Sequence, residues 1–293
     1  MAKKTALILS GGGAKGAFEA GAERYAREVK GYQWDIIAGV SVGALNGAML
    51  AMEKYQRLWE IWNSISNNQV YTGGFNLWSV IKLLFGAKSF YENEPLAKLL
   101  KAELEPEKVR ADLRVGSVSL VTGEYVQFTR DDPNLAKAVL ASTVMPVIWT
   151  PVDISSTYRS MVDGGVRNVS PIGDVLDSNP DEIVIINCGP ETGTVLSSPP
   201  GNVVQIGERT LDIMLNEMFR SDMDEFQRIN GLVKEAESHG VTLHNPKNGQ
   251  LLKYFEVKII EPDFSLDDTL DFSQPSIQRS LKAGWDKAKV VFG

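Results

Sequence analysis

The sequence has almost none of the residues that crosslink a chain or hold a zinc ion. Its 293 residues include one cysteine, Cys188, and two histidines. A disulfide within the chain is therefore impossible, and these three side chains are one short of the four that a structural zinc site uses. Neither an HExxH motif nor an EF-hand loop is present, so we expect no metal and no other cofactor. Cys188 ends an apolar run, which indicates a buried thiol.

Long apolar stretches and an excess of positive charge are missing as well. After Lys3 and Lys4 the first apolar run ends at Leu9, which is too short for a signal-peptide core. Nothing approaches the ~20 apolar residues of a membrane span, so we expect a cytoplasmic protein. The net charge of −7 and the pI near 5.1 argue against a nucleic-acid partner and give no general attraction to anionic membranes.

What the sequence does contain is an alternation of apolar strands and amphipathic helices. Apolar runs at Thr5–Leu9, 36–40, 181–187 and 254–260 predict strands, and helical stripes at 14–29, 208–237 and 276–291 predict helices. A hairpin is expected from 113–120 and 124–129. The pattern indicates a three-layer α/β fold with a mostly parallel sheet flanked by helices on both faces. No clear boundary divides the chain, so we expect a single domain over residues 1–293.

A candidate nucleophile lies between a predicted strand and a predicted helix. Gly39-Val40-Ser41-Val42-Gly43 has the pattern G-x-S-x-G. A serine on such a sharp turn presents its hydroxyl outward, and the glycines Gly39 and Gly43 relieve crowding around it. The N-terminus of the following helix stabilises negative charge nearby. A serine that only caps this helix would leave the same pattern.

A glycine-rich loop follows the first predicted strand. It consists of Gly11, Gly12, Gly13, Ala14, Lys15 and Gly16. Such loops let backbone N–H groups converge on an anion. The spacing fits the dinucleotide fingerprint G-x-G-x-x-G, but the nearby acid, Asp35, precedes the second strand instead of ending it. A Walker loop is excluded because Gly16 follows Lys15. The other interpretation is an oxyanion hole that serves Ser41, and the loop alone leaves both open.

A third motif, Asp163-Gly164-Gly165, follows the short apolar pair Met161-Val162. An aspartate at a strand end with glycines behind it points into a cleft while the chain turns away, although Asp-Gly is also a common turn dipeptide. All three motifs lie in loops or at the carboxyl ends of predicted strands, where open α/β sheets place their binding sites.

Together, and in this order, the three motifs resemble the patatin-like phospholipase family. Ala141-Ser142, Pro146 and Pro151-Val152 also look like the stretch that precedes the family's aspartate, so the similarity covers roughly the first 175 residues. It implies a patatin-like fold and a catalytic dyad of Ser41 and Asp163. It also implies an oxyanion hole from the backbone N–H groups of Gly11–Gly13, and hydrolysis without calcium. The supporting positions are Lys15, where the family carries a basic residue, and Gly16, Gly39, Gly43, Gly164 and Gly165.

The resemblance implies a lipid acyl hydrolase that acts on a phospholipid or another fatty-acyl ester, with transient contact to a membrane surface. An unperturbed carboxylate, with a pKa of about 3.9, is a poor base at neutral pH, so we expect Asp163 to be shielded from water. The apolar stretch from Phe75 to Phe90 is consistent with a lipid-contacting cap and equally with a buried helix.

Three alternatives remain at this stage. A general carboxylesterase or thioesterase would use the same scaffold, and a nucleotide-binding protein would use the glycine loop. A non-catalytic binding protein would keep the scaffold without exposing its site. An α/β-hydrolase triad would need a histidine after Asp163, but His239 and His244 lie in a polar loop where we expect solvated side chains. Residues after about 175 predict only further sheet and helices.

Overall fold

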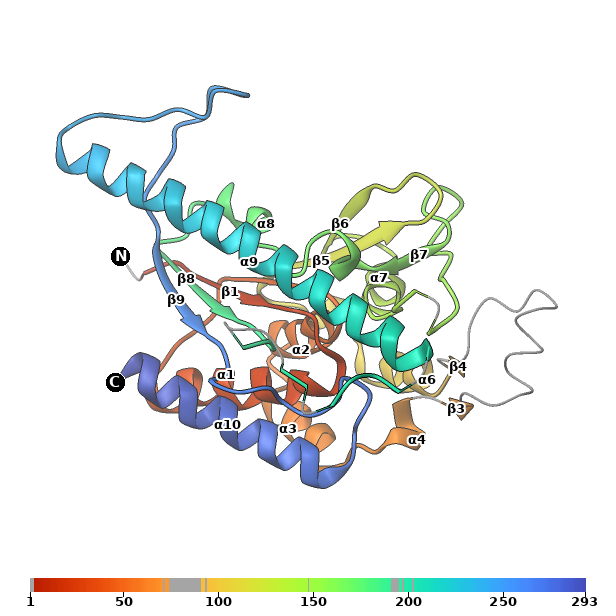
Figure 1. Cartoon of the computed structure of the whole chain (residues 1–293). Coiled ribbons are helices and arrows are strands. Elements are labelled where there is room, and N and C mark those ends of the chain that lie inside the picture. Colours follow the sequence, from red (N-terminus) through yellow and green to blue (C-terminus); the bar gives the residue numbers. More distant parts are fainter. Residues whose placement is uncertain are drawn as a thin grey trace.

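The computed structural model describes residues 3–70, 72–73, 91–92, 94–146, 148–190, 195–196, 198–201 and 203–293. Within these residues the chain forms a seven-stranded sheet between two layers of helices (Figure 1). This is the mostly parallel, three-layer α/β arrangement that the strand and helix pattern predicted. The stretch from Phe75 to Phe90 lies outside the described residues.

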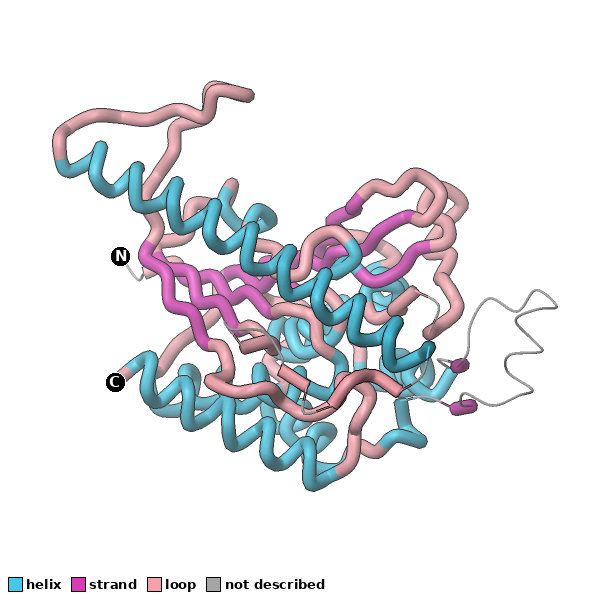
Figure 2. The backbone as a smooth tube through the Cα atoms, viewed as in Figure 1, coloured by secondary structure: helices cyan, strands magenta, loops and turns pink. Residues whose placement is uncertain are grey.

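The main sheet has the order β6-β5-β2-β1-β8-β9, and β7 pairs with β5 (Figure 2). Its strands are β1 (Thr5–Leu9), β2 (Ile36–Gly39), β5 (Asp112–Ser119), β6 (Tyr125–Thr129), β7 (Met161–Asp163), β8 (Glu182–Ile186) and β9 (Glu256–Ile260). The β1–β2, β1–β8, β2–β5 and β8–β9 pairs are parallel, whereas β6 and β7 are antiparallel to β5. A separate antiparallel pair joins β3 (Thr72–Gly73) to β4 (Tyr91–Glu92).

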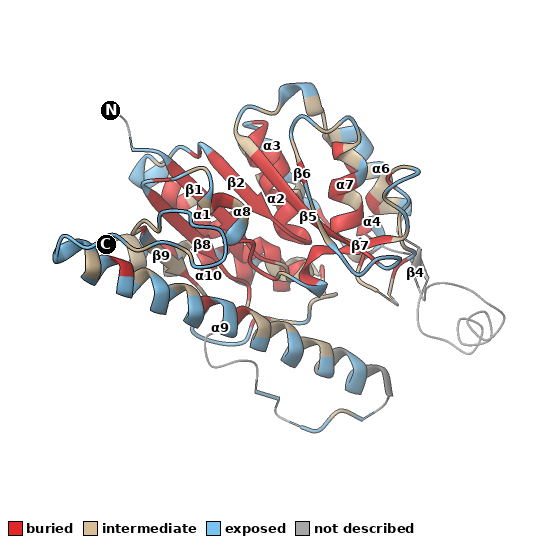
Figure 3. Ribbon diagram, turned by 90° about the horizontal axis from the view of Figure 1, so that it is seen from above, coloured by how far each residue is buried: buried red, intermediate tan, exposed pale blue. Residues whose placement is uncertain are grey.

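The strands β1, β2 and β8 are mostly apolar because helices cover both of their faces. Along β1, Leu7 and Leu9 pack into one core, and Ala6 and Ile8 pack into the other. Successive side chains of a strand point to opposite faces, so this alternation assigns each core to one face of the sheet. The red strands between paler helices in Figure 3 reflect the same two-sided burial.

Two groups of helices form the outer layers. On the face of Leu7, the core includes α1 (Gly16–Lys30), α2 (Val42–Ala51), α3 (Tyr55–Ser64) and α10 (Gln274–Phe292). On the face of Ile8, it includes α8 (Gly173–Leu176) and α9 (Val203–Ser238). The remaining helices are α4 (Asn67–Val70), α6 (Glu94–Glu103), α7 (Leu135–Ser142), η1 (Gly13–Lys15), η2 (Pro106–Lys108) and η3 (Gly164–Val166). No helix in the described part of the chain is long and apolar enough to cross a membrane.

The pairing of β5 determines where two loops meet. The strand β2 runs parallel to the first half of β5 and ends with Gly39 opposite Val115. The strand β7 runs antiparallel along the second half and ends with Asp163 opposite Ser117. The two strands therefore approach each other end to end along the same edge of β5, and their carboxyl ends meet beside Gly116.

Candidate active site

Ser41 occupies a strained turn between β2 and α2. Its φ of 56° lies in the left-handed region, which L side chains rarely adopt. Its backbone N–H donates to the Ser142 hydroxyl oxygen at 3.0 Å, and only 8% of the residue is exposed. Strain of this kind persists where the surrounding structure holds it, and it clusters at functional sites.

The two glycines around Ser41 allow the turn to fit against β1. A Cβ atom added at Gly43 would lie 2.4 Å from the carbonyl oxygen of Leu9, and one at Gly39 would lie 2.4 Å from the carbonyl oxygen of Gly43. Real Cβ atoms do not approach backbone atoms this closely, so neither position accepts a side chain without a shift of the backbone. The turn that presents Ser41 therefore depends on both glycines.

Asp163 reaches Ser41 because β7 ends where β2 ends. Its backbone N–H donates to the carbonyl oxygen of Val144 at 2.9 Å, and its Oδ1 accepts the N–H of Gly165 at 2.7 Å. The Ser41 hydroxyl lies close to the same carboxylate and lowers its pKa. Gly164 makes the turn possible, since a Cβ there would lie 2.5 Å from the carbonyl oxygen of Gly116.

Burial changes the acidity of Asp163. The residue is 6% exposed, which confirms the expected shielding from water. Loss of hydration disfavours the charged carboxylate and raises the pKa of Asp163 to about 6, against the opposing hydrogen bonds from Ser41 and Gly165. A carboxyl group with this pKa is a stronger base than a solvated aspartate and is still mostly ionised at neutral pH.

The glycine-rich loop lies directly against Ser41. A Cβ atom added at Gly11 would lie 3.0 Å from the Ser41 Cβ and 3.6 Å from its Oγ. Gly12 packs against Cys188, and Gly13, with a φ of 56°, packs against the carbonyl oxygen of Thr269. Among the described residues, none accepts a hydrogen bond from the backbone N–H groups of Gly11, Gly12 and Gly13. The loop that contacts Ser41 therefore carries three backbone N–H groups without an acceptor among these residues.

Two further residues of the loop have structural contacts. Gly16 begins α1 against Val42, where an added Cβ would lie 2.4 Å from a methyl group. The Nζ atom of Lys15 lies 3.7 Å from Asp212 of α9. This ion pair joins the loop to the helix that covers the opposite face of the sheet.

A buried network of side-chain hydrogen bonds connects the helices behind the site. Asn46 of α2 donates to the Glu19 carboxylate at 2.8 Å and to the carbonyl oxygen of Gly16 at 2.9 Å. The indole N–H of Trp62 donates to the Asn46 side-chain oxygen at 2.9 Å. Burial raises the pKa of Glu19 to about 8, and the hydrogen bond from Asn46 opposes this rise. This hydrogen-bond network connects α1, which follows the glycine loop, to α2, which follows Ser41.

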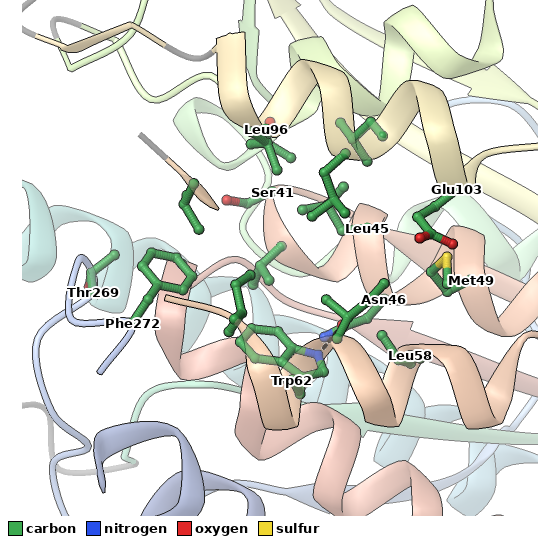
Figure 4. Close-up of a pocket in the computed structure, with 18 of the residues that line it drawn as sticks. Ser41, Leu45, Asn46, Met49, Leu58, Trp62, Leu96, Glu103, Thr269 and Phe272 are labelled. Atoms are coloured by element: carbon green, nitrogen blue, oxygen red, sulfur yellow. Dashed lines mark hydrogen bonds between the residues drawn. The ribbon is translucent and has the colours of Figure 1, made fainter. Parts of the chain in front are cut away.

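Beside Ser41 an apolar cavity of about 90 Å³ extends between α2, α3 and α6 (Figure 4). Interiors of proteins contain few voids larger than a water molecule, so this one is unusual. Aliphatic, aromatic and methionine side chains form most of its wall, and Thr269 and Phe272 contribute from the loop before α10. Such a cavity suits a linear hydrocarbon group attached to the atom that meets Ser41.

The acid that a dinucleotide site would need and the histidine that a catalytic triad would need both lie away from Ser41. The Asp35 carboxylate accepts the backbone N–H of Thr5 at 2.8 Å, at the amino end of β1 and therefore at the edge opposite the glycine loop. His239 and His244 are exposed beyond the C-terminal end of α9. Asp212 is the residue of α9 that pairs with Lys15 of the glycine loop. His239 follows it by 27 residues, which corresponds to roughly 40 Å along a helix. Neither a dinucleotide fingerprint nor a Ser–Asp–His triad is assembled from these residues.

Metal chemistry finds no support in the described residues. No group of three or more His, Cys, Asp or Glu side chains among them is arranged to hold a metal ion. Cys188 is buried, as expected, and burial raises the pKa of its thiol well above the ordinary value. The thiol is therefore protonated and unreactive at neutral pH.

Several residues around the site were not singled out by the sequence. Ser142 was noted only as part of a family-like stretch. Thr269 and Phe272 lie after residue 175, where the sequence predicted only further sheet and helices. They belong to a loop without hydrophobic periodicity. For Asn46 a signal existed, because a polar residue on the otherwise apolar helix at 42–51 indicates a buried hydrogen bond.

Comparison with known proteins adds a family and distant structural neighbours. The family model described as patatin-like phospholipase matches residues 7–176. The crystal structure of VipD from Legionella pneumophila is 14% identical, with 99% of this chain and 66% of that chain covered and a TM-score of 0.48. The type III effector protein ExoU is 12% identical, with 99% and 52% covered and a TM-score of 0.42.

A third structure is the heterodimeric complex ExoU-SpcU from the type III secretion system of Pseudomonas aeruginosa. It is 16% identical, with 77% of this chain and 51% of that chain covered and a TM-score of 0.30. The present chain thus spans between about half and two thirds of the length of these three chains.

Proposed function

The chain belongs to the patatin-like phospholipase family of lipid hydrolases, and we propose that it hydrolyses the acyl ester bond of a phospholipid or another fatty-acyl ester through a Ser41–Asp163 dyad. The observation that carries this proposal is the strained Ser41, which lines an apolar cavity and lies close enough to the buried Asp163 carboxylate to lower its pKa. A nucleophile, a base and a binding site for an acyl chain are thereby combined.

Acylation begins with the proton of the Ser41 hydroxyl. Asp163 takes this proton while Oγ attacks the ester carbonyl carbon, which forms a tetrahedral intermediate. The oxyanion accepts hydrogen bonds from the backbone N–H groups of Gly11–Gly13. The bond between the carbonyl carbon and the alcohol oxygen then breaks, and Asp163 returns the proton to the departing alcohol. The acyl group remains on Ser41 with its hydrocarbon chain in the cavity.

Deacylation repeats these steps with water. Asp163 removes a proton from a water molecule, whose oxygen attacks the acyl-enzyme carbonyl carbon. The second tetrahedral intermediate uses the same N–H donors. Its collapse releases the fatty acid and restores the Ser41 hydroxyl with the proton from Asp163. The net reaction consumes one ester and one water and needs no metal or redox partner.

We further propose that residues 1–293 form one domain. The strands β8 and β9, which follow the part that matches the family, extend the same sheet from β1. The loop before α10 supplies Thr269 and Phe272 to the wall of the cavity. A chain truncated after residue 176 would therefore lack part of both the sheet and the site.

Labelling with a fluorophosphonate tests the nucleophile. We expect the probe to modify Ser41, identified by peptide mass spectrometry, because such probes react with serines that a base activates. Labelling should disappear in Ser41→Ala and slow strongly in Asp163→Ala. A matched control is Ser170→Ala, which removes a buried serine hydroxyl that does not line the cavity beside Ser41 and should label as the parent does. Absence of labelling at Ser41, with and without lipid micelles, would reject the proposed mechanism.

The pH dependence of the reaction follows from Asp163. A base with a pKa of about 6 is protonated and inactive below that pH, so kcat/KM is expected to fall about tenfold per pH unit below pH 6 and to level off above it. An aspartate with its ordinary pKa would instead keep nearly full activity at about pH 5. The measurement is a pH–rate profile on a soluble ester, with thermal unfolding recorded at each pH.

Histidine titration is the competing explanation for such a profile, and the chain has only two histidines. Both are exposed and distant from Ser41. A His239→Gln/His244→Gln double variant should therefore keep the same profile. Movement of the acidic limb in that variant would contradict the assignment to Asp163.

A further inference from the structure

Glu19 of α1 is a buried carboxyl group that the proposed reaction does not use. None of the residue is exposed, and its Oε2 atom accepts the Asn46 amide at 2.8 Å. The other oxygen, Oε1, is buried and has no hydrogen-bond partner among the described residues. In that part of the chain no lysine, arginine or histidine forms an ion pair with it either. An ionised Glu19 would therefore be a buried charge without a counterion, which is costly.

A neutral carboxyl group suits these surroundings better. Its carbonyl oxygen accepts the Asn46 amide at Oε2, and its hydroxyl group occupies the Oε1 position, where no donor is needed. The Cys188 thiol and the backbone of Ser10 lie close enough to Glu19 to lower its pKa. Burial has the larger effect and raises this pKa to about 8. Glu19 is therefore protonated at neutral pH and ionises in mildly alkaline solution.

The neighbours of Glu19 support the glycine loop from behind. Ser10 follows β1 and leads into the loop, and its hydroxyl oxygen accepts the backbone N–H of Cys188 at 3.0 Å. Cys188 in turn packs against Gly12, where an added Cβ would lie 2.6 Å from the Cys188 Cβ. A shift of Glu19 would therefore be transmitted to the beginning and the middle of the loop.

The same carboxyl group is connected to the end of the loop and to the cavity. The Asn46 amide that donates to Glu19 also donates to the carbonyl oxygen of Gly16 at 2.9 Å. The Asn46 side-chain oxygen accepts the indole N–H of Trp62 at 2.9 Å, and both residues line the cavity beside Ser41 (Figure 4). Both amide protons of Asn46 are thereby used, so a change of charge at Glu19 alters the whole network.

We propose that Glu19 is a positioning residue, which holds the glycine loop in place as a neutral carboxylic acid and releases it on ionisation. The inference rests on the proposed ester hydrolysis and gives that reaction an alkaline limit. Ionisation leaves a buried charge with one oxygen that has no donor, so α1 has to move until water or another donor reaches it. Because α1 follows the loop directly, this movement displaces the backbone N–H groups of Gly11–Gly13 from the oxyanion.

The other titratable groups around Glu19 do not account for such a limit. Burial raises the pKa of the Cys188 thiol well above its ordinary value, so the thiol stays neutral while Glu19 ionises. Lys15 of the loop lowers the pKa of that thiol, and its Nζ lies 3.7 Å from Asp212. Glu23, one turn further along α1, pairs with an arginine of the same helix at 3.1 Å. The helix α2, which supplies Asn46, contains no titratable side chain.

Ester hydrolysis in alkaline solution tests the proposal. For p-nitrophenyl butyrate, with the rate of Ser41→Ala subtracted, the kcat/KM of the parent should fall about tenfold per pH unit above about pH 8. The amide of Glu19→Gln does not ionise but still accepts from Asn46, so this variant should lose the alkaline fall and keep the acidic one. At about pH 7, Glu19→Ala should lower kcat about tenfold, because the loop loses its support, and Glu19→Gln should restore it.

Two matched variants separate Glu19 from its neighbours. Glu23 is 2% exposed and burial raises its pKa too, but its carboxylate accepts from Arg27 and Trp34, which lie outside the loop. Glu23→Gln should therefore keep the alkaline fall, and so should Cys188→Ala. Loss of the fall in either control, or its persistence in Glu19→Gln, would overturn the proposal. Thermal unfolding is recorded for each variant at each pH.

Titration of Trp62 distinguishes failure of this inference from failure of the proposed function. In the inactive Ser41→Ala chain with nitrogen-15-labelled tryptophan, the Trp62 indole N–H resonance should shift with a midpoint at about pH 8, because Asn46 connects it to Glu19. The shift should be absent in Ser41→Ala/Glu19→Gln. This titration in a protein whose parent hydrolyses no ester would reject the function and keep the neutral Glu19. A resonance that stays fixed through pH 8 beside normal hydrolysis would overturn this inference alone.

Discussion

Replacement of Asp163 by asparagine is expected to lower kcat/KM for acyl esters by about 10⁴-fold, at the upper end of what general-base catalysis contributes. Asparagine has the shape of aspartate, and its carbonyl oxygen still accepts the N–H of Gly165 beside the Ser41 hydroxyl. What it cannot do is take a proton. The loss therefore isolates the proton transfer from the geometry of the site, which is unchanged.

The same variant is expected to be no less stable than the parent. The pKa of Asp163 is about 6 in the folded chain, above the ordinary value of 3.8. Between these two pH values the unfolded chain has lost a proton that the folded chain keeps, so folding stability falls as the pH rises from 3.8 through 6. Asparagine does not ionise, so the variant does not lose this stability as the pH rises. At about pH 8 the midpoint of thermal unfolding of Asp163→Asn should equal or exceed that of the parent.

Steady-state kinetics and scanning calorimetry on the same preparations check both expectations. The double variant Ser41→Ala/Asp163→Asn should be no slower than the slower single variant, because groups that act in one step are not additive. Activity of Asp163→Asn within about tenfold of the parent would remove Asp163 as the base. A large loss of both activity and stability would instead assign the residue a structural role.

The nucleophile turn could be predicted from sequence because its signal is local. The glycines around Ser41, the strand before it and the helix after it are neighbours in the chain, and the close approach of Gly43 to β1 requires glycine there. The central strands β1 and β8 were also predictable, since burial on both faces demands an uninterrupted apolar run. In both cases the physical cause lies within about ten residues.

Asp163 was less accessible to sequence reasoning because its position depends on strand pairing. Three residues form β7, and they follow an irregular segment without periodicity. Only the antiparallel pairing with the second half of β5 brings the carboxylate to the end of β2. The motif Asp163-Gly164-Gly165 pointed to the residue through family resemblance, whereas its burial and its contact with Ser41 are tertiary effects.

The cavity was not predicted because its apolar residues look like ordinary core. Trp62 and Leu58 fit the buried face of an amphipathic helix whether they contact protein or a ligand. Glu103, which lines the same cavity, was equally hidden, since a glutamate in the last turn of a helix suggests a solvated side chain. Glu19 is a stronger exception, because a carboxyl group with a pKa of about 8 on a buried helical face contradicts the usual pattern.

Substitution of Gly11 by alanine keeps the backbone N–H but displaces it, and is expected to lower kcat by up to about 10²- to 10³-fold, the effect of losing one oxyanion donor. The added Cβ would lie 3.0 Å from the Ser41 Cβ, so either the loop or the serine has to move by a few tenths of an ångström. The backbone of Gly11 is not in the left-handed region, so alanine introduces no strain of its own. Gly13 is a poorer choice for this test, because its φ of 56° and its contact with Thr269 would add a folding defect.

The control is Gly173→Ala, where an added Cβ has no heavy atom of the described residues within 4 Å. We expect that variant to keep its kcat, and both variants to unfold within a few degrees of the parent. Phosphonylation of Ser41 passes through a similar anionic transition state, so fluorophosphonate labelling of Gly11→Ala should slow together with ester hydrolysis. Slow hydrolysis with unchanged labelling would mean that the loop positions the substrate, since the probe would still meet an intact nucleophile and intact donors.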